Sequence, residues 1–279
     1  MTIDGKKIAQ GIIEKLKVQT VPQKIMAAVL AGENPTSISF LKQKEKIAKE
    51  LGVDFRIYKF PADLTSSPQA EIKNDDLRKE VGKIALLKPV GGVIVQLPLP
   101  THLNRHYILN IIPREKDVDV LGERALGAFY VGRNPVLPPA VGVVEEILQD
   151  TKYKIQDTKV AVVGLGFLTG KPIATWLMDK AKKISIFKRN NDLSELKEYD
   201  LIISGVGQAG IIKPEMLKKG AGIIDFGYSF DENGKISGDF DTQLPITNYQ
   251  LLNFYTPTPN GTGPILVAKI FENFYKLNL

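Results

Sequence analysis

The chain of 279 residues contains no cysteine at all, so disulfides, thiolate metal sites and cysteine nucleophiles are excluded. Long apolar runs are absent too, because no stretch approaches the roughly 20 residues that a membrane-spanning helix needs. The N-terminus, Met1–Lys7, has no apolar segment behind its charges, which a signal peptide would require. We therefore expect a cytoplasmic protein that has no membrane partner.

Histidine is scarce, and the two present are His102 and His106. Four residues apart, they could face one way on a helix as metal ligands. No third histidine and no carboxylate accompanies them, so we predict no metal site. Packing at the N-terminus of a helix is the use that we expect for them.

The net charge of +6 is moderately basic for a chain of this length. Such a charge can indicate a nucleic-acid partner. The lysines, however, are spread over many segments and no arginine–aromatic cluster accompanies them. We therefore predict no nucleic-acid partner, and a basic surface of this kind also suits small polyanions such as dinucleotides.

Apolar residues alternate between helical and strand spacing from one end of the chain to the other. Strands are predicted at 25–30, 53–60, 92–96, 160–163, 184–187, 201–204 and 223–226. Helices are predicted around 8–16, 36–51 with Thr36 and Ser37 as caps, 77–87, 170–181 and 264–276. Alternation of this kind predicts an α/β fold with parallel sheets and helices on both faces. The glycine- and proline-rich stretch 121–142 is a candidate interdomain segment.

One strand leads directly into a glycine-rich turn, over the residues 160–170. Glycines at Gly164, Gly166 and Gly170, with Leu165 between the first two, let the backbone turn tightly and approach a pyrophosphate at a helix N-terminus. The spacing is one residue wider than the common dinucleotide fingerprint, so a tight turn without a ligand is the alternative.

The residues after the next strand bear on which dinucleotide is bound. An acidic residue there would favour NAD, but the sequence has Lys188 and Arg189, which can pair with the 2′-phosphate of NADP. We predict NADP, with NAD possible and a solvated basic turn as the alternative. Gly205, Gly207 and Tyr228 follow two further strands and are predicted to contact the cofactor, because open α/β sheets bind ligands at the C-terminal ends of their strands.

Several other fragments occur in a recognisable order. They are Ile3–Lys6, Gly32–Ser37, Val95–Pro100, Lys116–Asp119, Gly238–Phe240 and Thr256–Pro264. In nearly this order they resemble the bifunctional methylenetetrahydrofolate dehydrogenase/methenyltetrahydrofolate cyclohydrolase family, from about residue 3 to 275. The resemblance implies an N-terminal α/β folate-binding catalytic domain over 1–137 and 256–279. It also implies a Rossmann-like dinucleotide-binding domain over 138–255, a C-terminal helix that returns to the first domain, and a homodimer.

The resemblance also implies a chemistry of one-carbon metabolism and purine biosynthesis. It is the NADP-linked oxidation of 5,10-methylenetetrahydrofolate, followed by hydrolysis to 10-formyltetrahydrofolate. Lys44 matches the catalytic lysine of the family, Gln96 the glutamine that positions it, and Asp119 the carboxylate that holds the pterin ring. Without the resemblance, Lys44 could be a solvated helix residue and Asp119 a helix cap. The substrate-binding residues implied are Phe40, Val95, Leu97, Pro259, Asn260, Gly261, Thr262 and Gly263.

Departures from the family pattern cluster around the predicted site. Phe40 replaces a tyrosine one helical turn before the lysine and so lacks a hydroxyl group, and Val120 replaces a glycine. The changed segment Pro138–Val141 lies before the connecting helix. An arginine–serine pair is replaced by Leu165–Gly166, and a histidine–serine pair by Lys188–Arg189. The alternatives are therefore an enzyme with only one of the two activities, and a non-catalytic dinucleotide-binding protein.

Overall fold

The computed structural model describes residues 1–61, 72–231, 234–242 and 251–279. The chain forms two compact units. The five-stranded unit contains Met1–Gly11 and Ala140–Leu266, and the three-stranded unit contains Ile12–Pro139 and Val267–Leu279. The prediction of an α/β fold with two domains and parallel sheets is confirmed, and the final part of the C-terminal helix belongs to the three-stranded unit. The domain boundaries at 137 and 256 remain a prediction.

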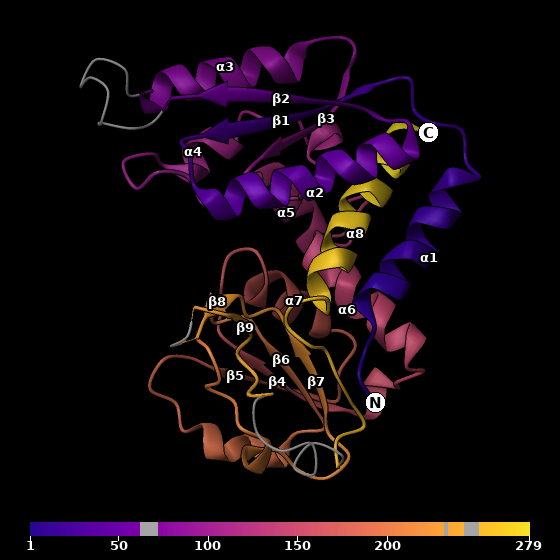
Figure 1. Ribbon diagram of the computed structural model, residues 1–279, viewed down its shortest axis with the longest axis vertical. Helices are drawn as coiled ribbons and strands as arrows, with labels where there is room; N and C mark the ends of the chain where they lie inside the picture. Colours follow the sequence, from indigo (N-terminus) through magenta and orange to yellow (C-terminus); the bar gives the residue numbers. More distant parts are fainter. Residues whose placement is uncertain (62–71, 232–233, 243–250) are drawn as a thin grey trace. The chain divides into compact units, whose positions relative to one another are not determined.

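The three-stranded unit has a parallel sheet in the order β2-β1-β3 (Figure 1). The central strand β1 and the strand β3 are buried along their whole length, whereas β2 has only exposed and partly buried residues. This difference follows from the sequence, since β1 and β3 are continuous apolar runs and β2 carries the charged residues Asp54, Arg56 and Lys59. The strands are β1 (Ile25–Ala31), β2 (Asp54–Phe60) and β3 (Val90–Val95).

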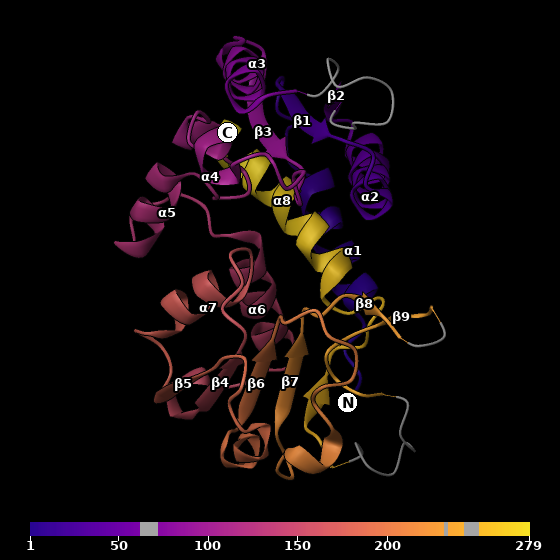
Figure 2. The same cartoon turned by 90° about the vertical axis from the view of Figure 1, so that its left-hand side faces the viewer.

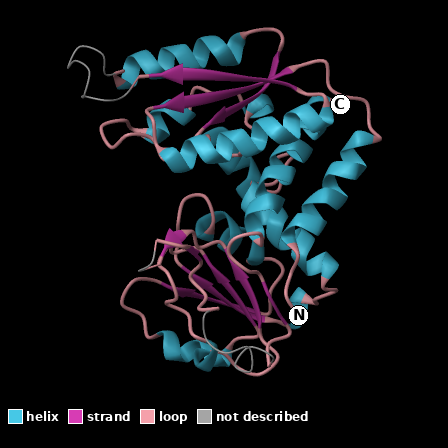
Figure 3. Ribbon diagram, viewed as in Figure 1, coloured by secondary structure: helices cyan, strands magenta, loops and turns pink. Residues whose placement is uncertain are grey.

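The same unit contains several helices (Figure 3). They are α2 (Pro35–Leu51), α3 (Asn74–Leu86), α4 (Arg105–Leu109), η1 (Arg114–Lys116), α5 (Glu123–Tyr130) and the last turns of α1 (Gly5–Lys17) and of α8 (Thr262–Asn278). Phe55 and Gly92 flank Met26 in adjacent strands and both meet α8. A Cβ atom on Gly92 would lie 2.7 Å from the ring of Phe274, so the close approach of α8 to β3 requires glycine.

The five-stranded unit has a second parallel sheet, in the order β10-β7-β6-β4-β5 (Figure 2). The core strands β6 and β7 are fully buried. The elements are α6 (Pro139–Asp150), η2 (Ile155–Asp157), β4 (Lys159–Val163), α7 (Gly170–Leu177), β5 (Lys183–Phe187), η3 (Leu193–Glu198), β6 (Leu201–Ser204), η4 (Pro214–Met216), β7 (Gly222–Asp225), the hairpin strands β8 (Ser229–Phe230) and β9 (Ile236–Ser237), and β10 (Phe254–Tyr255).

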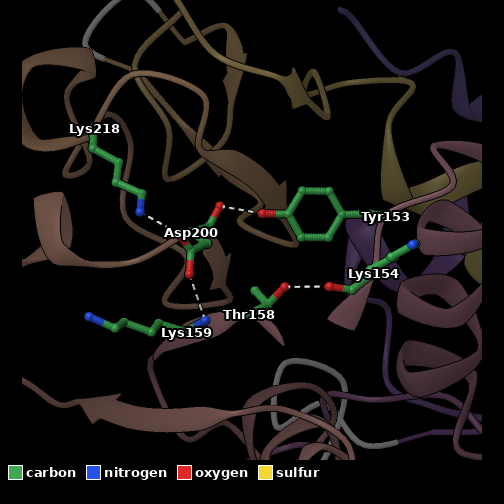
Figure 4. Close-up of polar contacts among 6 residues, drawn as sticks. All are labelled: Tyr153, Lys154, Thr158, Lys159, Asp200 and Lys218. Carbon is green, nitrogen blue, oxygen red and sulfur yellow. Dashed lines mark hydrogen bonds and ion pairs between the residues drawn. The ribbon is translucent and has the colours of Figure 1, made fainter. Parts of the chain in front are cut away.

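A polar cluster fastens the N-terminal ends of these strands (Figure 4). Asp200, directly before β6, accepts a hydrogen bond of 2.7 Å from the backbone N–H of Lys159 at the start of β4. Its other carboxylate oxygen pairs with Lys218, and its carbonyl accepts from the hydroxyl of Tyr153 at 2.8 Å. These contacts hold neighbouring strands in register at their N-terminal ends. Open α/β sheets bind ligands at the opposite, C-terminal ends of their strands.

One of the local predictions was wrong. Helix α2 is capped by Asn34, whose side chain accepts from the N–H of Ser37 at 3.0 Å, and Thr36 lies inside the helix. The cap falls there because Pro35 is well suited to the first helical position. The predicted interdomain segment 121–142 does contain the passage between the units, at Pro139 and Ala140. It also contains the helix α5, which was not predicted, and the start of α6. Gly127 lies inside α5 at a position where a Cβ atom would meet no other atom within 4 Å.

Among the described residues, no helix is both long enough and apolar enough to cross a membrane.

Candidate active site

Lys44 lies on the buried face of α2. The buried residues of this helix recur every three or four positions, which is the spacing of one helical face, and they are Ser37, Leu41, Lys44, Ala48 and Leu51. Only 6% of Lys44 is exposed, although a lysine on an amphipathic helix is usually solvated. The apolar periodicity of α2 therefore places this amine inside the three-stranded unit.

Gln96 follows directly after β3 and holds the lysine. Its side-chain oxygen Oε1 accepts a hydrogen bond of 2.7 Å from Nζ of Lys44. Its Nε2 group donates to the carbonyl of Leu97 at 2.9 Å, and its backbone N–H donates to Val29 at 2.9 Å. The amide is thus fixed with its acceptor oxygen directed to the lysine, as a buried polar group requires.

Asp119 belongs to a turn that is organised by a second acid, Asp117. The Asp117 carboxylate is buried and accepts from the backbone N–H groups of Leu121 at 3.0 Å and Gly122 at 2.7 Å. A bridge to Val93 joins the same residue to β3. Asp119 is therefore carried on a turn whose geometry is set by backbone hydrogen bonds.

The residue after Asp119 has an unusual backbone conformation. Val120 has a φ of 56°, in the left-handed region that β-branched residues rarely adopt. Its side chain is fully buried and packs with Ala125 and Val136. The family resemblance implied a glycine at this position, and this chain forms the turn with a buried valine instead.

Burial changes the proton affinities of these groups. The pKa of Lys44 is lowered by burial, and the negative charge of Asp119 opposes part of that change. The pKa of Asp119 is raised by burial and pulled back by the charge of Lys44. Burial, together with the nearby charge of Asp119, raises the pKa of Asp117 to about 7 despite its backbone hydrogen bonds. The site therefore holds an amine that gives up its proton more readily than an exposed lysine.

The other predicted substrate residues of this unit lie close in the chain to the lysine and the glutamine. Phe40 is partly buried, one turn before Lys44 on α2, Val95 is the buried last residue of β3, and Leu97 is partly buried. Ser37, which was predicted as a helix cap and not as a site residue, is buried, and its hydroxyl donates to the carbonyl of Leu97 at 3.5 Å. The first turn of α2 thus reaches the segment that follows β3.

The glycine turn of the five-stranded unit joins β4 to α7. Gly164 has a φ of 86°, and a Cβ atom on Gly170 would overlap the carbonyl oxygen of Gly164. A Cβ atom on Gly205 would lie 2.6 Å from the hydroxyl of Thr169. The turn therefore closes tightly in spite of its extra residue, and glycine is required on both sides of it.

A cavity of about 630 Å³ opens at the C-terminal ends of β4, β5 and β6. Four of the predicted cofactor residues line it: Gly164, Lys188, Arg189 and Gly207. The remaining lining residues are Val163, Phe187, Asn190, Asn191, Leu193, Val206, Gln208 and Ile211. The backbone N–H of Lys188 donates to the side chain of Asn191 at 2.6 Å, which shapes the basic turn. The predicted cofactor residues outside this lining are Leu165, Gly166, Gly170, Gly205 and Tyr228.

The loop at 259–263 is held within the five-stranded unit. Asn260 has a φ of 80°, and a Cβ atom on Gly5 would overlap the carbonyl oxygen of Gly261. The hydroxyl of Thr262 donates to the carbonyl of Asp225 at 2.9 Å. Two fragments from opposite ends of the sequence, around Gly5 and around Gly261, therefore pack against each other.

The two histidines lie near α4. His102 precedes the helix, with its Nε2 atom 3.3 Å from the carbonyl of Ile72, and His106 lies in the first turn. Asn104 caps the helix by accepting from the N–H groups of His106 and Tyr107. Within the described ranges, no group of three or more histidine, aspartate or glutamate side chains could hold a metal ion.

Comparison with known proteins agrees with this arrangement. Residues 3–119 match the tetrahydrofolate dehydrogenase/cyclohydrolase catalytic domain, and residues 138–278 match the NAD(P)-binding domain of the same description. The bifunctional protein FolD of Bacillus licheniformis is 30% identical over 98% of this chain and 95% of its own length. The FolD protein of Listeria innocua is also 30% identical, with the same coverage of both chains.

Solved structures show the same fold. The bifunctional FolD methylenetetrahydrofolate dehydrogenase/cyclohydrolase of Campylobacter jejuni has a TM-score of 0.91 and 28% identity, covering 100% of this chain and 98% of that one. The Trypanosoma brucei enzyme, solved with NADP and an inhibitor, has a TM-score of 0.88 and 24% identity, covering 99% and 96%. At 24% identity, the second likeness bears on the fold alone.

Proposed function

Because this chain belongs to the tetrahydrofolate dehydrogenase/cyclohydrolase family, we propose that it catalyses both reactions of that family. The first is oxidation of 5,10-methylenetetrahydrofolate to the 5,10-methenyl cation with NADP. The second is hydrolysis of that cation to 10-formyltetrahydrofolate. The observation that carries the proposal is the buried hydrogen bond between Lys44 and Gln96.

A buried amine suits the hydrolytic step. Water forms a bond to the cationic carbon, one carbon–nitrogen bond of the bridge breaks, and the net reaction releases one proton. Burial lowers the pKa of Lys44, so a larger share of its amine is neutral, and able to take up that proton, than in an exposed lysine. Gln96 accepts a hydrogen bond from the amine but offers it no proton, so it orients Nζ and leaves its basicity in place.

Asp119 is the proposed anchor of the pterin ring. The amino and ring N–H groups of a pterin form a two-donor edge, which a carboxylate can accept. The turn that carries Asp119 is fixed by the buried carboxylate of Asp117, which would hold the anchor in place. We further propose that Phe40, Val95 and Leu97 contact the substrate, together with the loop residues Pro259, Asn260, Gly261, Thr262 and Gly263.

The cavity of the five-stranded unit fits a dinucleotide that carries an additional phosphate. Lys188 and Arg189 are exposed at its wall, with no acidic residue in the lining to repel a phosphate group. The glycine turn from Gly164 to Gly170 at the start of α7 would receive the pyrophosphate on its amide groups. Gly205, Gly207 and Tyr228 are proposed to complete the site. When bound, NADP supplies the acceptor for the hydride. NAD remains the alternative cofactor.

One observation favours a narrower activity. Phe40 occupies the place of a tyrosine one turn before Lys44, and it can stack on a ring but cannot donate a hydrogen bond. An enzyme that retains the dehydrogenase with a weakened cyclohydrolase is therefore the second candidate.

A purified-protein assay separates these candidates. Formation and decay of methenyltetrahydrofolate would be followed by absorbance, with NADP and NAD in separate reactions. We expect both steps above the uncatalysed rate, with NADP preferred. Oxidation without accelerated hydrolysis would support the second candidate, and no acceleration of either step with either cofactor would refute both.

Assembly, location and boundaries are proposed from the same resemblance. We propose a homodimer in the cytoplasm, with a folate domain over 1–137 and 256–279 and a dinucleotide domain over 138–255. Family membership is what supports these assignments.

A further inference from the structure

A buried carboxylate, Asp239, gathers the loop that follows β6. Asp239 is fully buried and follows the β8–β9 hairpin by two residues, and its contacts with Ser204 and Gly227 place it beside the C-terminal ends of β6 and β7. The hairpin and these two strands are labelled in Figures 1 and 2. Its Oδ2 atom accepts from the Ser204 hydroxyl at 2.6 Å and from the Val206 N–H at 2.7 Å. Its Oδ1 atom accepts from the N–H groups of Gly207 and Gln208, both at 2.8 Å. One side chain thus satisfies three consecutive amides and the last side chain of the strand.

These four hydrogen bonds decide what the loop can offer a ligand. Val206, Gly207 and Gln208 all line the cavity at this sheet edge. Since their amides donate to Asp239, those amides cannot also donate to a phosphate on the opposite side. The loop therefore presents its side chains and the Gly207 Cα atom to the cavity. Phosphate groups must find their donors at the glycine turn and at the basic residues across the cavity.

The opposite wall leaves little room for the loop to shift. A Cβ atom on Gly164 would lie 3.1 Å from a methyl group of Val206 and 3.3 Å from the carbonyl oxygen of Gly205. The glycine turn and the 205–208 loop are therefore in close contact at the base of the cavity. A displacement of the loop by a fraction of an ångström would alter the space between them.

A second buried acid, Asp225, holds the segment that carries Asp239. Asp225, the last residue of β7, accepts from the N–H of Gly227 at 2.6 Å and from the N–H of Phe240 at 2.9 Å. Burial and the charge of Asp239 raise the pKa of Asp225 to about 7. A Cβ atom on Gly227 would overlap Asp239. The sequence fragment around Gly238, which resembled the family without an assigned role, thus contributes to a compact hydrogen-bonded core.

We propose that Asp239 is a positioning residue for dinucleotide binding, which holds the 205–208 wall of the cavity in its binding conformation. This inference rests on the proposed cofactor site and adds a residue that itself touches no ligand. A carboxylate suits the role because it is an acceptor only, with room for four donors. An asparagine of the same shape would turn an N–H₂ group towards two of those donors.

The test compares Asp239→Asn with the exposed control Asp157→Asn, which removes the same charge from the same unit. NADP binding would be measured by calorimetry, and hydrolysis of methenyltetrahydrofolate would be measured without any dinucleotide. We expect the NADP dissociation constant of Asp239→Asn to rise about tenfold or more, because hydrogen bonds to a charged acceptor are lost. Its hydrolysis rate and the properties of Asp157→Asn should stay within about twofold of wild type.

Unchanged NADP binding by a folded Asp239→Asn would overturn the inference. If that variant also loses hydrolysis or its thermal transition, Ser204→Ala decides, because it removes a single donor to Oδ2. A rise of about threefold to tenfold in its dissociation constant supports the role, and an unchanged constant refutes it. Failure of the wild-type protein to bind NADP or NAD would instead remove the proposed cofactor, and this inference with it.

Discussion

Replacing Lys44 by methionine should abolish most of the hydrolytic activity and leave the fold intact. Methionine has a similar length and can occupy the same buried position on α2, but it has no proton to exchange. The substitution removes the 2.7 Å hydrogen bond to Gln96 and leaves that amide oxygen without its donor. The two consequences, for stability and for rate, have different magnitudes.

For stability, the opposing contributions nearly cancel. Loss of the hydrogen bond leaves the buried Gln96 oxygen without its donor, which costs about 1–3 kcal/mol. Removal of the buried polar amine relieves a desolvation penalty of about 1–3 kcal/mol. We expect the free energy of unfolding to change by less than about 2 kcal/mol, in either direction. For the rate, loss of a positioned acid–base group costs about 10²–10⁴-fold, which corresponds to roughly 3–5.5 kcal/mol of activation free energy.

The assay is the decay of methenyltetrahydrofolate absorbance, with a urea titration of each variant alongside. Lys42→Met is the matched control, because Lys42 is exposed on the same helix and its loss should leave the rate within about twofold of wild type. Dehydrogenase activity of Lys44→Met should fall less than hydrolysis. A folded Lys44→Met protein that hydrolyses the substrate at the wild-type rate would remove Lys44 from the mechanism.

Two further substitutions test the cofactor site and the strained turn. Replacing Lys188 by aspartate and Arg189 by serine should raise the Michaelis constant for NADP about tenfold or more and leave that for NAD nearly unchanged. An equal effect on both constants would indicate that the two residues form a solvated turn and do not bind the 2′-phosphate. The free energies of unfolding of Val120→Gly and Val120→Ala, measured by urea titration, should agree to within about 1 kcal/mol. Glycine relieves about 1–2 kcal/mol of left-handed backbone strain, and this gain offsets the lost methyl group and the greater chain entropy of the unfolded state. A Val120→Gly protein about 2 kcal/mol less stable than Val120→Ala would contradict that strain.

The strands were predictable because apolar runs are a local signal. β1 and β3 are continuous apolar segments buried on both faces, and the sequence predicts both to within a few residues. α5 was missed, since Gly127 inside it suggested a loop. The two-residue strand β10 escaped prediction too, because it is defined by pairing with β7 and not by its own composition.

The candidate site was predictable where its residues carry a family resemblance. It was not predictable where a role depends on hydrogen bonds between residues far apart in the sequence. Burial of Lys44 can be deduced from its place in the apolar period of α2, but its bond to Gln96 joins residues 52 positions apart. The role of Asp239 depends on hydrogen bonds from the Ser204 hydroxyl, 35 positions earlier in the chain, and from three amides 31–33 positions earlier, which no local pattern reveals. Acids whose partners are backbone groups leave no complementary charge in the sequence.

The most direct test of the account is the pH dependence of methenyltetrahydrofolate hydrolysis by the wild-type protein and by Gln96→Glu. The wild-type rate should be carried by an amine whose pKa lies below the ordinary 10.5, because burial of Lys44 disfavours its charged form. A carboxylate at position 96 would favour the ammonium form, so the pKa of Lys44 rises and the rising limb of the profile moves about one to three pH units higher. Activity lost at pH 7 should then return in part at alkaline pH. Profiles that coincide after subtraction of the uncatalysed rate would contradict the proposal that Lys44, held by Gln96, moves the proton.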